Sequence, residues 1–150
     1  RGKGMKTIET IITKHGGLEA LKEHAIAIEN KPYMKLCIEY IGQGPRNKPL
    51  ISVAHYGEQN GDAMRDPDMV FEVETFDGFT TDSGKPFLWG WYPVSFRNDY
   101  VGLYQEATWE ENGKVLTKPV LVKHLTMFAK EWDRNIAEQG FLIAQKQAQS

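Results

Sequence analysis

Residues 55–69, with the sequence HYGEQNGDAMRDPDM, hold the side chains of this chain that are best suited to chemistry. They combine one histidine, four acids, two neighbouring amides and one arginine. Imidazole and carboxylate groups bind divalent cations and also act as general bases, so the stretch is a candidate metal site or catalytic loop. The same polar composition is also typical of a hairpin turn that contacts a partner.

The metal interpretation predicts a metal-dependent hydrolase or nuclease. Asp62, Asp66 and Asp68 would hold Mg²⁺ or Mn²⁺, and His55 would be a further ligand. The bound ion would lower the pKa of a water molecule, and Glu58 or His55 would act as the general base. This interpretation requires the carboxylates to converge on one point.

The hairpin interpretation rests on turn-forming residues. Residues 60–61, Asn-Gly, supply the positive φ angles of a tight reversal, and residues 66–68, Asp-Pro-Asp, are a second turn signal. His55 shares a strand face with Ile51 and Val53 because strand side chains alternate, so we expect it to be half-buried.

The charge of the chain is unevenly distributed. The net charge is −2, but residues 50–112 carry 3 basic and 12 acidic side chains. An acidic segment disfavours a nucleic-acid-binding surface there. A cation or a basic surface of a partner would match it better.

The composition is typical of one soluble domain over residues 1–150. Residues 1–4 precede Met5 and are expected to be foreign to the domain, and residues 143–150 are expected to fray. The single cysteine, Cys37, excludes an internal disulfide and is consistent with a reducing, cytoplasmic compartment. No apolar run approaches the roughly 18–20 residues that span a bilayer, so no membrane contact is expected.

Helical periodicity predicts helices at both ends of the chain. Residues 6–24 indicate two short helices separated by a Gly-Gly break at residues 16–17. Residues 118–139 indicate a longer helix followed by Gly140. Apolar residues in the longer helix recur at spacings of three or four, the pattern of one buried face.

Between the helices the hydrophobic period is two, as in half-buried strands. Strands are predicted on both sides of a turn at residues 42–48, and residues 101–109 indicate another strand before the Asn-Gly turn at residues 111–114. Pro93 argues against a central strand over residues 87–96. The pattern predicts an α+β domain, in which an antiparallel sheet of about five to six strands is packed by an N-terminal helical pair and a C-terminal helix.

The aromatic run FLWGWYPVSF at residues 87–96 is a second candidate site. If one face of the run is open, Trp89 and Trp91 form a binding surface beside Asn98 and Asp99. Otherwise the aromatic rings fill the space between the sheet and the C-terminal helix. A further alternative is a structural homo-oligomer that buries the run in a symmetric interface.

Residues 52–73, SVAHYGEQNGDAMRDPDMVFEV, and residues 91–106, WYPVSFRNDYVGLYQE, resemble a small uncharacterised domain family of bacterial plasmid, conjugative-element and phage proteins. The most specific part is a motif of the type HYxEQNGDxMxDPxM. The family has no assigned activity, so the resemblance implies no catalytic residue. It implies a bacterial or phage mobile-element origin and a cytoplasmic setting. Small acidic single-domain proteins in such a setting are often inhibitors or decoys of host defence systems, which is an association and not a mechanism.

The favoured hypothesis is a non-enzymatic binding domain without a cofactor. Its acidic hairpin and the adjacent tryptophan-rich surface would bind a host protein or a small nucleotide-like ligand, while nucleic acid and membrane are not expected partners and a homodimer is left open. The expected contact residues are His55, Tyr56, Glu58, Asn60, Asp62, Arg65, Asp68, Trp89, Trp91, Asn98 and Asp99.

Overall fold

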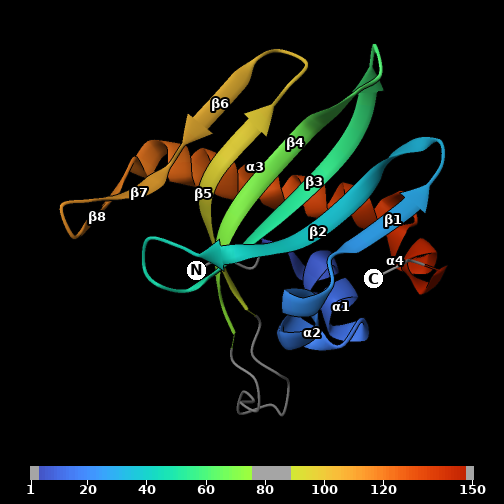
Figure 1. Ribbon diagram of the computed structural model, residues 1–150, viewed down its shortest axis with the longest axis horizontal. Helices are drawn as coiled ribbons and strands as arrows, with labels where there is room; N and C mark the ends of the chain where they lie inside the picture. The colour runs from blue at the N-terminus through green and yellow to red at the C-terminus, as the bar shows by residue number, and fades with distance from the viewer. Residues whose placement is uncertain (1–3, 76–88, 148–150) are drawn as a thin grey trace.

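Within the described residues, 4–75 and 89–147, six strands form one antiparallel sheet in the order in which they occur along the chain (Figure 1). The structure is a computed structural model. The turn signals at residues 77–78 and 83–86 lie outside the described residues. The strands are β1 (Ile26–Asn30), β2 (Tyr33–Gln43), β3 (Pro49–Gln59), β4 (Asp62–Glu74), β5 (Gly90–Asn98) and β6 (Leu103–Glu106).

Helices from both ends of the chain pack on one face of this sheet. In Figure 1, α3 crosses the face that is turned away from the viewer. Gly16 and Gly17, with φ of +105° and +83°, separate α1 from α2 as predicted. The predicted α+β class is confirmed, and no helix of the described ranges is long and apolar enough to cross a membrane. The helices are α1 (Lys6–Lys14), α2 (Gly17–Glu23), α3 (Pro119–Glu138), α4 (Phe141–Ala144) and the 3-10 helix η1 (Gln145–Gln147).

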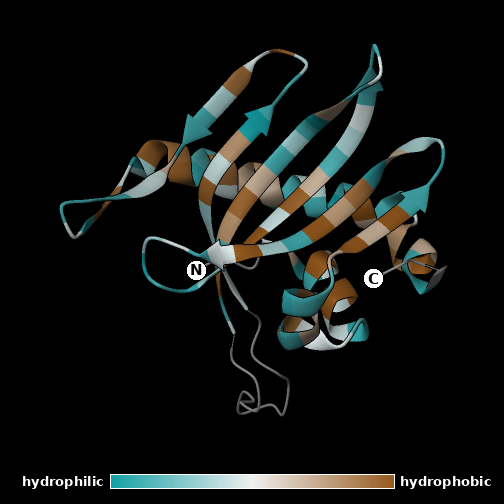
Figure 2. Cartoon of the chain, in the orientation of Figure 1, coloured by the Kyte–Doolittle hydropathy of each residue, from teal (hydrophilic) through white to brown (hydrophobic). Residues whose placement is uncertain are grey.

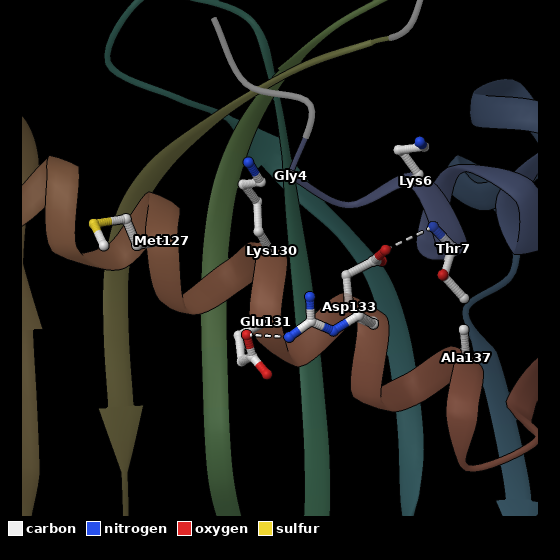
Figure 3. Close-up of a pocket in the computed structure, with 9 residues that line it drawn as sticks. Gly4, Lys6, Thr7, Met127, Lys130, Glu131, Asp133 and Ala137 are labelled. Atoms are coloured by element: carbon white, nitrogen blue, oxygen red, sulfur yellow. Dashed lines mark hydrogen bonds and ion pairs between the residues drawn. The ribbon is translucent and has the colours of Figure 1, made fainter.

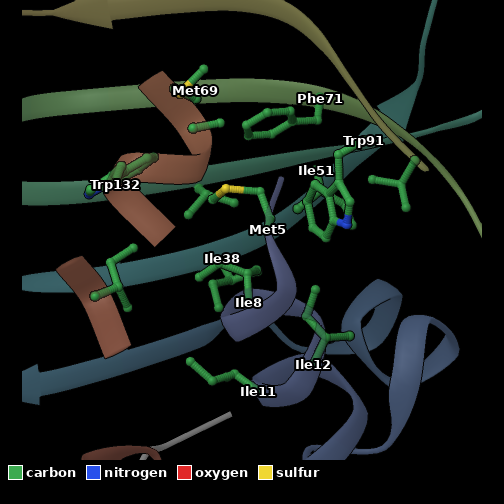
Figure 4. Packing of buried hydrophobic residues seen from close by; sticks show 14 of the residues in the cluster. Met5, Ile8, Ile11, Ile12, Ile38, Ile51, Met69, Phe71, Trp91 and Trp132 are labelled. Carbon is green, nitrogen blue, oxygen red and sulfur yellow. The ribbon is translucent and has the colours of Figure 1, made fainter. Parts of the chain in front are cut away.

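The face of the sheet that meets the helices is apolar. Large apolar side chains occupy every second position on this face of β3 and β4, as the period of two predicts, and Ser52 and Ala54 between them are buried as well. Figure 4 shows how side chains of α1 and α3 pack against the strands. The buried side chains include Ile8, Ile11 and Ile12 of α1, Leu36 and Ile38 of β2, Ile51 and Val53 of β3, Met69 and Phe71 of β4, and Leu125, Trp132 and Ile136 of α3.

Trp89 and Trp91 belong to this core, with exposed fractions of 8% and 2%. Glu9 of α1 accepts hydrogen bonds from the backbone N–H of Trp89 (2.9 Å) and from the indole Nε1 of Trp91 (3.0 Å). The expectation of an exposed tryptophan-rich surface is therefore wrong, because α1 supplies the acceptor that a buried indole needs. Because both rings are already buried within one chain, they are not available to the symmetric interface of the homo-oligomer alternative.

A second buried carboxylate, that of Asp133, joins α3 to α1. It accepts hydrogen bonds from the backbone N–H groups of Thr7 (2.9 Å) and Ile8 (3.2 Å). Figure 3 shows the bond from Thr7, beside a groove of about 500 Å³ that residues of α1 and α3 line. Because the first N–H groups of a helix lack partners within the helix, Asp133 caps α1 from a different helix. Burial raises the pKa of the Asp133 carboxyl.

Pro93 lies inside β5, contrary to the expectation that it excludes a strand between two others. β5 pairs with β4 along most of its length, but it pairs with β6 only from Ser95 onward. The ladder to β4 also shifts register between Val70 and Phe71, opposite Pro93. At Pro93, β5 therefore has no partner in β6, and its pairing with β4 is interrupted. A proline is tolerated at such a position because no ladder hydrogen bond from its nitrogen is required.

The strand predicted over residues 101–109 is two strands in different sheets. β6 ends at Glu106, and β7 (Thr108–Glu111) pairs with β8 (Lys114–Thr117) in a separate two-stranded sheet. The buried Ala107 marks the division: its N–H donates to the Val94 carbonyl (2.7 Å) and its carbonyl accepts from Lys118 (2.9 Å). The predicted Asn-Gly turn between β7 and β8 is confirmed by positive φ at Asn112 and Gly113.

The C-terminal tail was expected to fray from residue 143, but α4 and η1 continue through residue 147. Phe141 and Gln145 are buried. The backbone carbonyl of Gln145 lies 3.1 Å from Nε2 of His15, so the tail is attached to α1. Gly140, with φ of +91°, allows the turn between α3 and α4, close to its predicted place at the end of the helix.

The stability of the fold should depend on Glu9 in a way that changes with pH. Burial raises the pKa of Glu9 above 4.5, so the unfolded chain loses its proton first and the folded state loses stability as pH rises through the folded pKa. Glu9→Gln keeps an accepting oxygen without the charge, so its free energy of unfolding should decrease less between about pH 4 and about pH 7. Urea unfolding at both pH values measures this.

Glu9→Ala is the matched control for the hydrogen bonds themselves. It leaves the indole N–H of Trp91 and the amide of Trp89 without an acceptor, so it should lower the free energy of unfolding by about 1–3 kcal/mol. If the free energy of unfolding changed equally with pH in the wild type and in Glu9→Gln, the raised pKa of the buried Glu9 carboxyl would be contradicted.

Candidate functional site

The hairpin formed by β3 and β4 extends beyond the rest of the sheet. β2 and β3 pair only as far as Lys35 opposite Tyr56, whereas β3 and β4 continue to pair as far as Gln59 opposite Asp62. The projecting end is seen in Figure 1, and its tip is hydrophilic in Figure 2. Residues 60–61 have the positive φ angles of the predicted Asn-Gly turn.

A bulge at the base of the hairpin separates the aspartates of the opening stretch. Ala54 lies opposite Asp68 and Tyr56 opposite Arg65, so residues 66 and 67 together face His55. An extra residue in one strand reverses the faces of the side chains that follow. Asp66 accordingly lies beside His55 on the helix side, while Asp68 accepts a hydrogen bond from Ser52 (2.7 Å) on the opposite face.

The predicted metal site is therefore not formed. Asp62, Asp66 and Asp68 do not converge, because the first lies at the exposed end of the hairpin and the other two point to opposite faces. In the described part of the chain, no group of three or more His, Cys, Asp or Glu side chains is placed to hold a metal ion.

Two hollows meet at the base of the hairpin, and both are lined by Pro32, Tyr33 and Met34. The larger, which we call the hairpin groove, has a volume of about 700 Å³ and lies between the start of β2 and the projecting hairpin. The smaller, the His55 pocket, has a volume of about 280 Å³. Besides the shared residues, the groove is lined by Glu29, Lys31, Lys35, Tyr56, Gly57, Glu58, Gly61 and Ala63, and the pocket by His55, Asp66 and Gln139.

His55 is the polar side chain that the fold buries at this point, with an exposed fraction of 8%. Its Nδ1 lies 3.1 Å from the backbone carbonyl of Met34. A carbonyl can only accept, so Nδ1 carries the proton and donates it. Burial lowers the pKa of His55, which keeps the ring neutral near pH 7 and leaves a lone pair on Nε2. The rings of Trp132 and Phe141 hold the imidazole, each at 5.5 Å between centroids.

The Nε2 atom of His55 is open. Within the described residues, the ring's hydrogen bond of good distance and angle is that of Nδ1 to the Met34 carbonyl. The backbone of Lys35 also lies near the ring and opposes the effect of burial on its pKa. Among the described residues, the only fully buried side-chain nitrogen or oxygen without a partner is Nε1 of Trp132. The equally unpaired Nε2 of His55 therefore keeps some access to solvent, and the pocket that His55 lines provides it.

Asp66 places a carboxylate in the same pocket. The amide nitrogen of Asn98 donates to its Oδ1 at 2.6 Å, which fixes the side chain. Within the described ranges Asp66 forms no ion pair. The His55 pocket thus presents an imidazole lone pair and a carboxylate, both of which accept hydrogen bonds.

Arg65 and Asp99 attach the hairpin to the turn after β5. The guanidinium Nε lies 2.8 Å from Asp99 Oδ2, and the backbone N–H of Arg65 donates to the same oxygen at 2.9 Å. The hydrogen bonds from Arg65 hold the pKa of the Asp99 carboxyl below its usual value. Both residues, which were predicted as ligand contacts, support the base of the hairpin.

The other predicted contact residues are divided between the two hollows and other places. Tyr56 and Glu58 line the hairpin groove. Asn60 and Asp62 are exposed at the tip, and Asp68 lies on the face away from the helices. On that face burial raises the pKa of the Cys37 thiol, which disfavours the reactive thiolate.

Four residues that line the His55 pocket were not predicted as site residues: Pro32, Tyr33, Met34 and Gln139. The available signal was an apolar pair, Tyr33-Met34, directly after a Lys-Pro turn. The pair alone does not indicate a site. Tyr33 and Met34 are exposed because β2 and β3 stop pairing at Lys35 and Tyr56, and the sequence does not show where that pairing ends.

The chain belongs to a protein family described as a domain of unknown function (DUF6908), whose family model matches residues 6–142. The matched range contains the whole sheet, α3 and all residues of the two hollows. No curated protein matches the chain, and no solved structure matches it.

Loss of Asp99 should loosen the hairpin base without unfolding the sheet. In Asp99→Ala the backbone N–H of Arg65 loses its acceptor, so its hydrogen exchange should become faster by roughly tenfold. Exchange followed by NMR measures this residue by residue. Asp62→Ala removes an aspartate at the tip of the same hairpin and should leave the exchange rate of the Arg65 amide unchanged. Equal rates in both variants would contradict the role of Asp99 in holding the hairpin base.

Proposed function

We propose that this protein is a non-enzymatic binding domain that captures an extended segment of a partner protein at the hairpin groove. The observation that carries the proposal is the separation of β2 from β3. Beyond the pair Lys35 and Tyr56, residues 33–34 and 57–59 are still strand residues, yet β2 and β3 no longer pair with each other there.

A strand edge without a neighbour has backbone N–H and C=O groups that can pair with another chain. An extended peptide that lies along such an edge forms main-chain hydrogen bonds, while its side chains enter adjacent pockets. The hairpin groove lies beside residues 57–58 of β3, and the His55 pocket adjoins it through Tyr33 and Met34. The arrangement supports recognition of a peptide backbone together with at least one side chain.

The surface chemistry of the groove also supports a protein partner. Tyr33 and Met34 have exposed fractions of 43% and 37% and lie at the junction of the two hollows. Charged side chains of both signs surround them, so an apolar centre has a polar rim, as in many protein interfaces. The nucleotide-like ligand is less well supported, because the tryptophan rings that would have stacked on a base are buried. The charged rim consists of Glu29, Lys31, Lys35 and Glu58.

A cytoplasmic setting and an origin in a plasmid or phage are parts of the same proposal. The single Cys37 is consistent with a reducing compartment. Inhibition of a host protein would be the consequence of capture if the bound segment is needed by that protein for another contact.

A random peptide library displayed on phage tests the proposal, with the wild-type protein as bait. Ala63 is exposed and lines the groove, so Ala63→Trp should fill the groove and weaken binding of the enriched peptides by at least roughly tenfold. Lys123→Trp adds the same ring at an exposed position of α3 and should bind them as the wild type does.

Two outcomes would contradict the proposal. One is the absence of any peptide enriched over an empty bait. The other is enrichment of peptides whose affinity is the same for Ala63→Trp and for the wild type.

A further inference from the structure

We propose that the His55 pocket is the specificity site of this domain and that it accepts the cationic end of a basic side chain, lysine or arginine. This inference rests on the proposed capture of a peptide segment and names the residue type that the segment must present. It combines two groups that different strands bring together: the imidazole of His55 from β3 and the carboxylate of Asp66 from β4.

The first supporting observation is the direction in which His55 can form hydrogen bonds. Its Nδ1–H is used by the Met34 carbonyl, so Nε2 can only accept. The side chain is 8% exposed, and what access Nε2 retains is into the pocket. A buried acceptor without a partner is unfavourable, and a donor from a ligand would satisfy it.

The second observation is the charge of Asp66. Its carboxylate receives one hydrogen bond, from the neutral amide of Asn98, and no described cation pairs with it. Asp66 is only partly exposed, so an ammonium or guanidinium group would meet it in surroundings of lower dielectric than water. An anionic ligand would instead face a carboxylate and a lone pair.

The size and walls of the pocket fit a side chain. At about 280 Å³ it is slightly smaller than the roughly 300–1,000 Å³ of sites for drug-sized ligands. Tyr33 contributes an aromatic ring and Met34 a flexible apolar chain, which suit the methylene stem of lysine or arginine and allow a cation–π contact. The pocket also opens beside the groove, because the same two residues line both hollows.

The ligand chemistry is tested with small probes that carry only the side-chain end. The ¹⁵N-labelled protein is titrated with n-butylammonium and n-propylguanidinium, and with butyrate and n-butanol as controls of similar length. The two cations should shift the amide signals of Met34 and His55 in a saturable way, whereas butyrate and n-butanol should not.

Matched variants separate the pocket from the general acidity of the hairpin. Asp66→Asn keeps an oxygen for Asn98 and should weaken binding of both cations by about tenfold or more. Asp62→Asn removes the same charge from the exposed tip and should change their affinity less than about twofold. His55→Phe keeps an aromatic ring without Nε2 and should also weaken binding, with its fold checked by the dispersion of its spectrum.

The cation specificity of the His55 pocket and the capture of peptides can fail independently. Equal binding of n-butanol and the cations, no saturable shift, or unchanged affinity in Asp66→Asn would overturn the cation specificity. Enriched peptides without a conserved lysine or arginine would also overturn it while leaving the proposed capture intact. Cation binding by a protein that enriches no peptide would support the pocket and contradict the capture.

Discussion

The apolar face of the six-stranded sheet must be covered, and the rest of the molecule is arranged by that requirement. α1 and α3 lie on this face and bury its side chains, and α4 closes the end of the cover beside β1. The cover ends where Trp132 and Phe141 meet His55. β3 and β4 continue beyond that point (Figure 1). The hairpin groove and the His55 pocket therefore lie at the boundary between the covered and the uncovered parts of the sheet.

Two buried carboxylates within the cover, those of Glu9 and Asp133, are paired with elements that are distant in sequence, whereas Nε1 of Trp132 has no partner among the described residues. Asp133 of α3 caps α1, and Glu9 of α1 accepts from two tryptophans that lead into β5. Each of the two carboxylates therefore satisfies two N–H groups of another element. His55 lies at the edge of the cover, and within the described ranges its Nδ1 is the ring nitrogen that forms a hydrogen bond of good distance and angle. His55 therefore contributes to the fold through Nδ1, and in the proposed function its Nε2 accepts a hydrogen bond from a ligand.

The parts of the fold that depend on local pattern could be predicted from the sequence. Helical periodicity identified α3, whose Leu125, Trp132 and Ile136 are buried, and Asn-Gly pairs identified both tight hairpins. The candidate stretch was correctly located at a hairpin, but its geometry was not accessible. One bulge residue decides that Asp66 joins His55 while Asp68 does not, and no sequence period reports it. The burial of Trp91 likewise depends on Glu9, 82 residues away.

The proposed ligand chemistry depends on His55, which donates to the Met34 carbonyl through Nδ1 and offers a lone pair at Nε2. A long-range ¹H–¹⁵N correlation spectrum of the histidine side chains near pH 7 tests this, with His55 assigned by comparison with His55→Phe. We expect a neutral ring with the proton on Nδ1 and an unprotonated Nε2. A neutral ring protonated at Nε2, or a doubly protonated ring, would contradict it, because Nε2 would then donate and the pocket could not favour a cation.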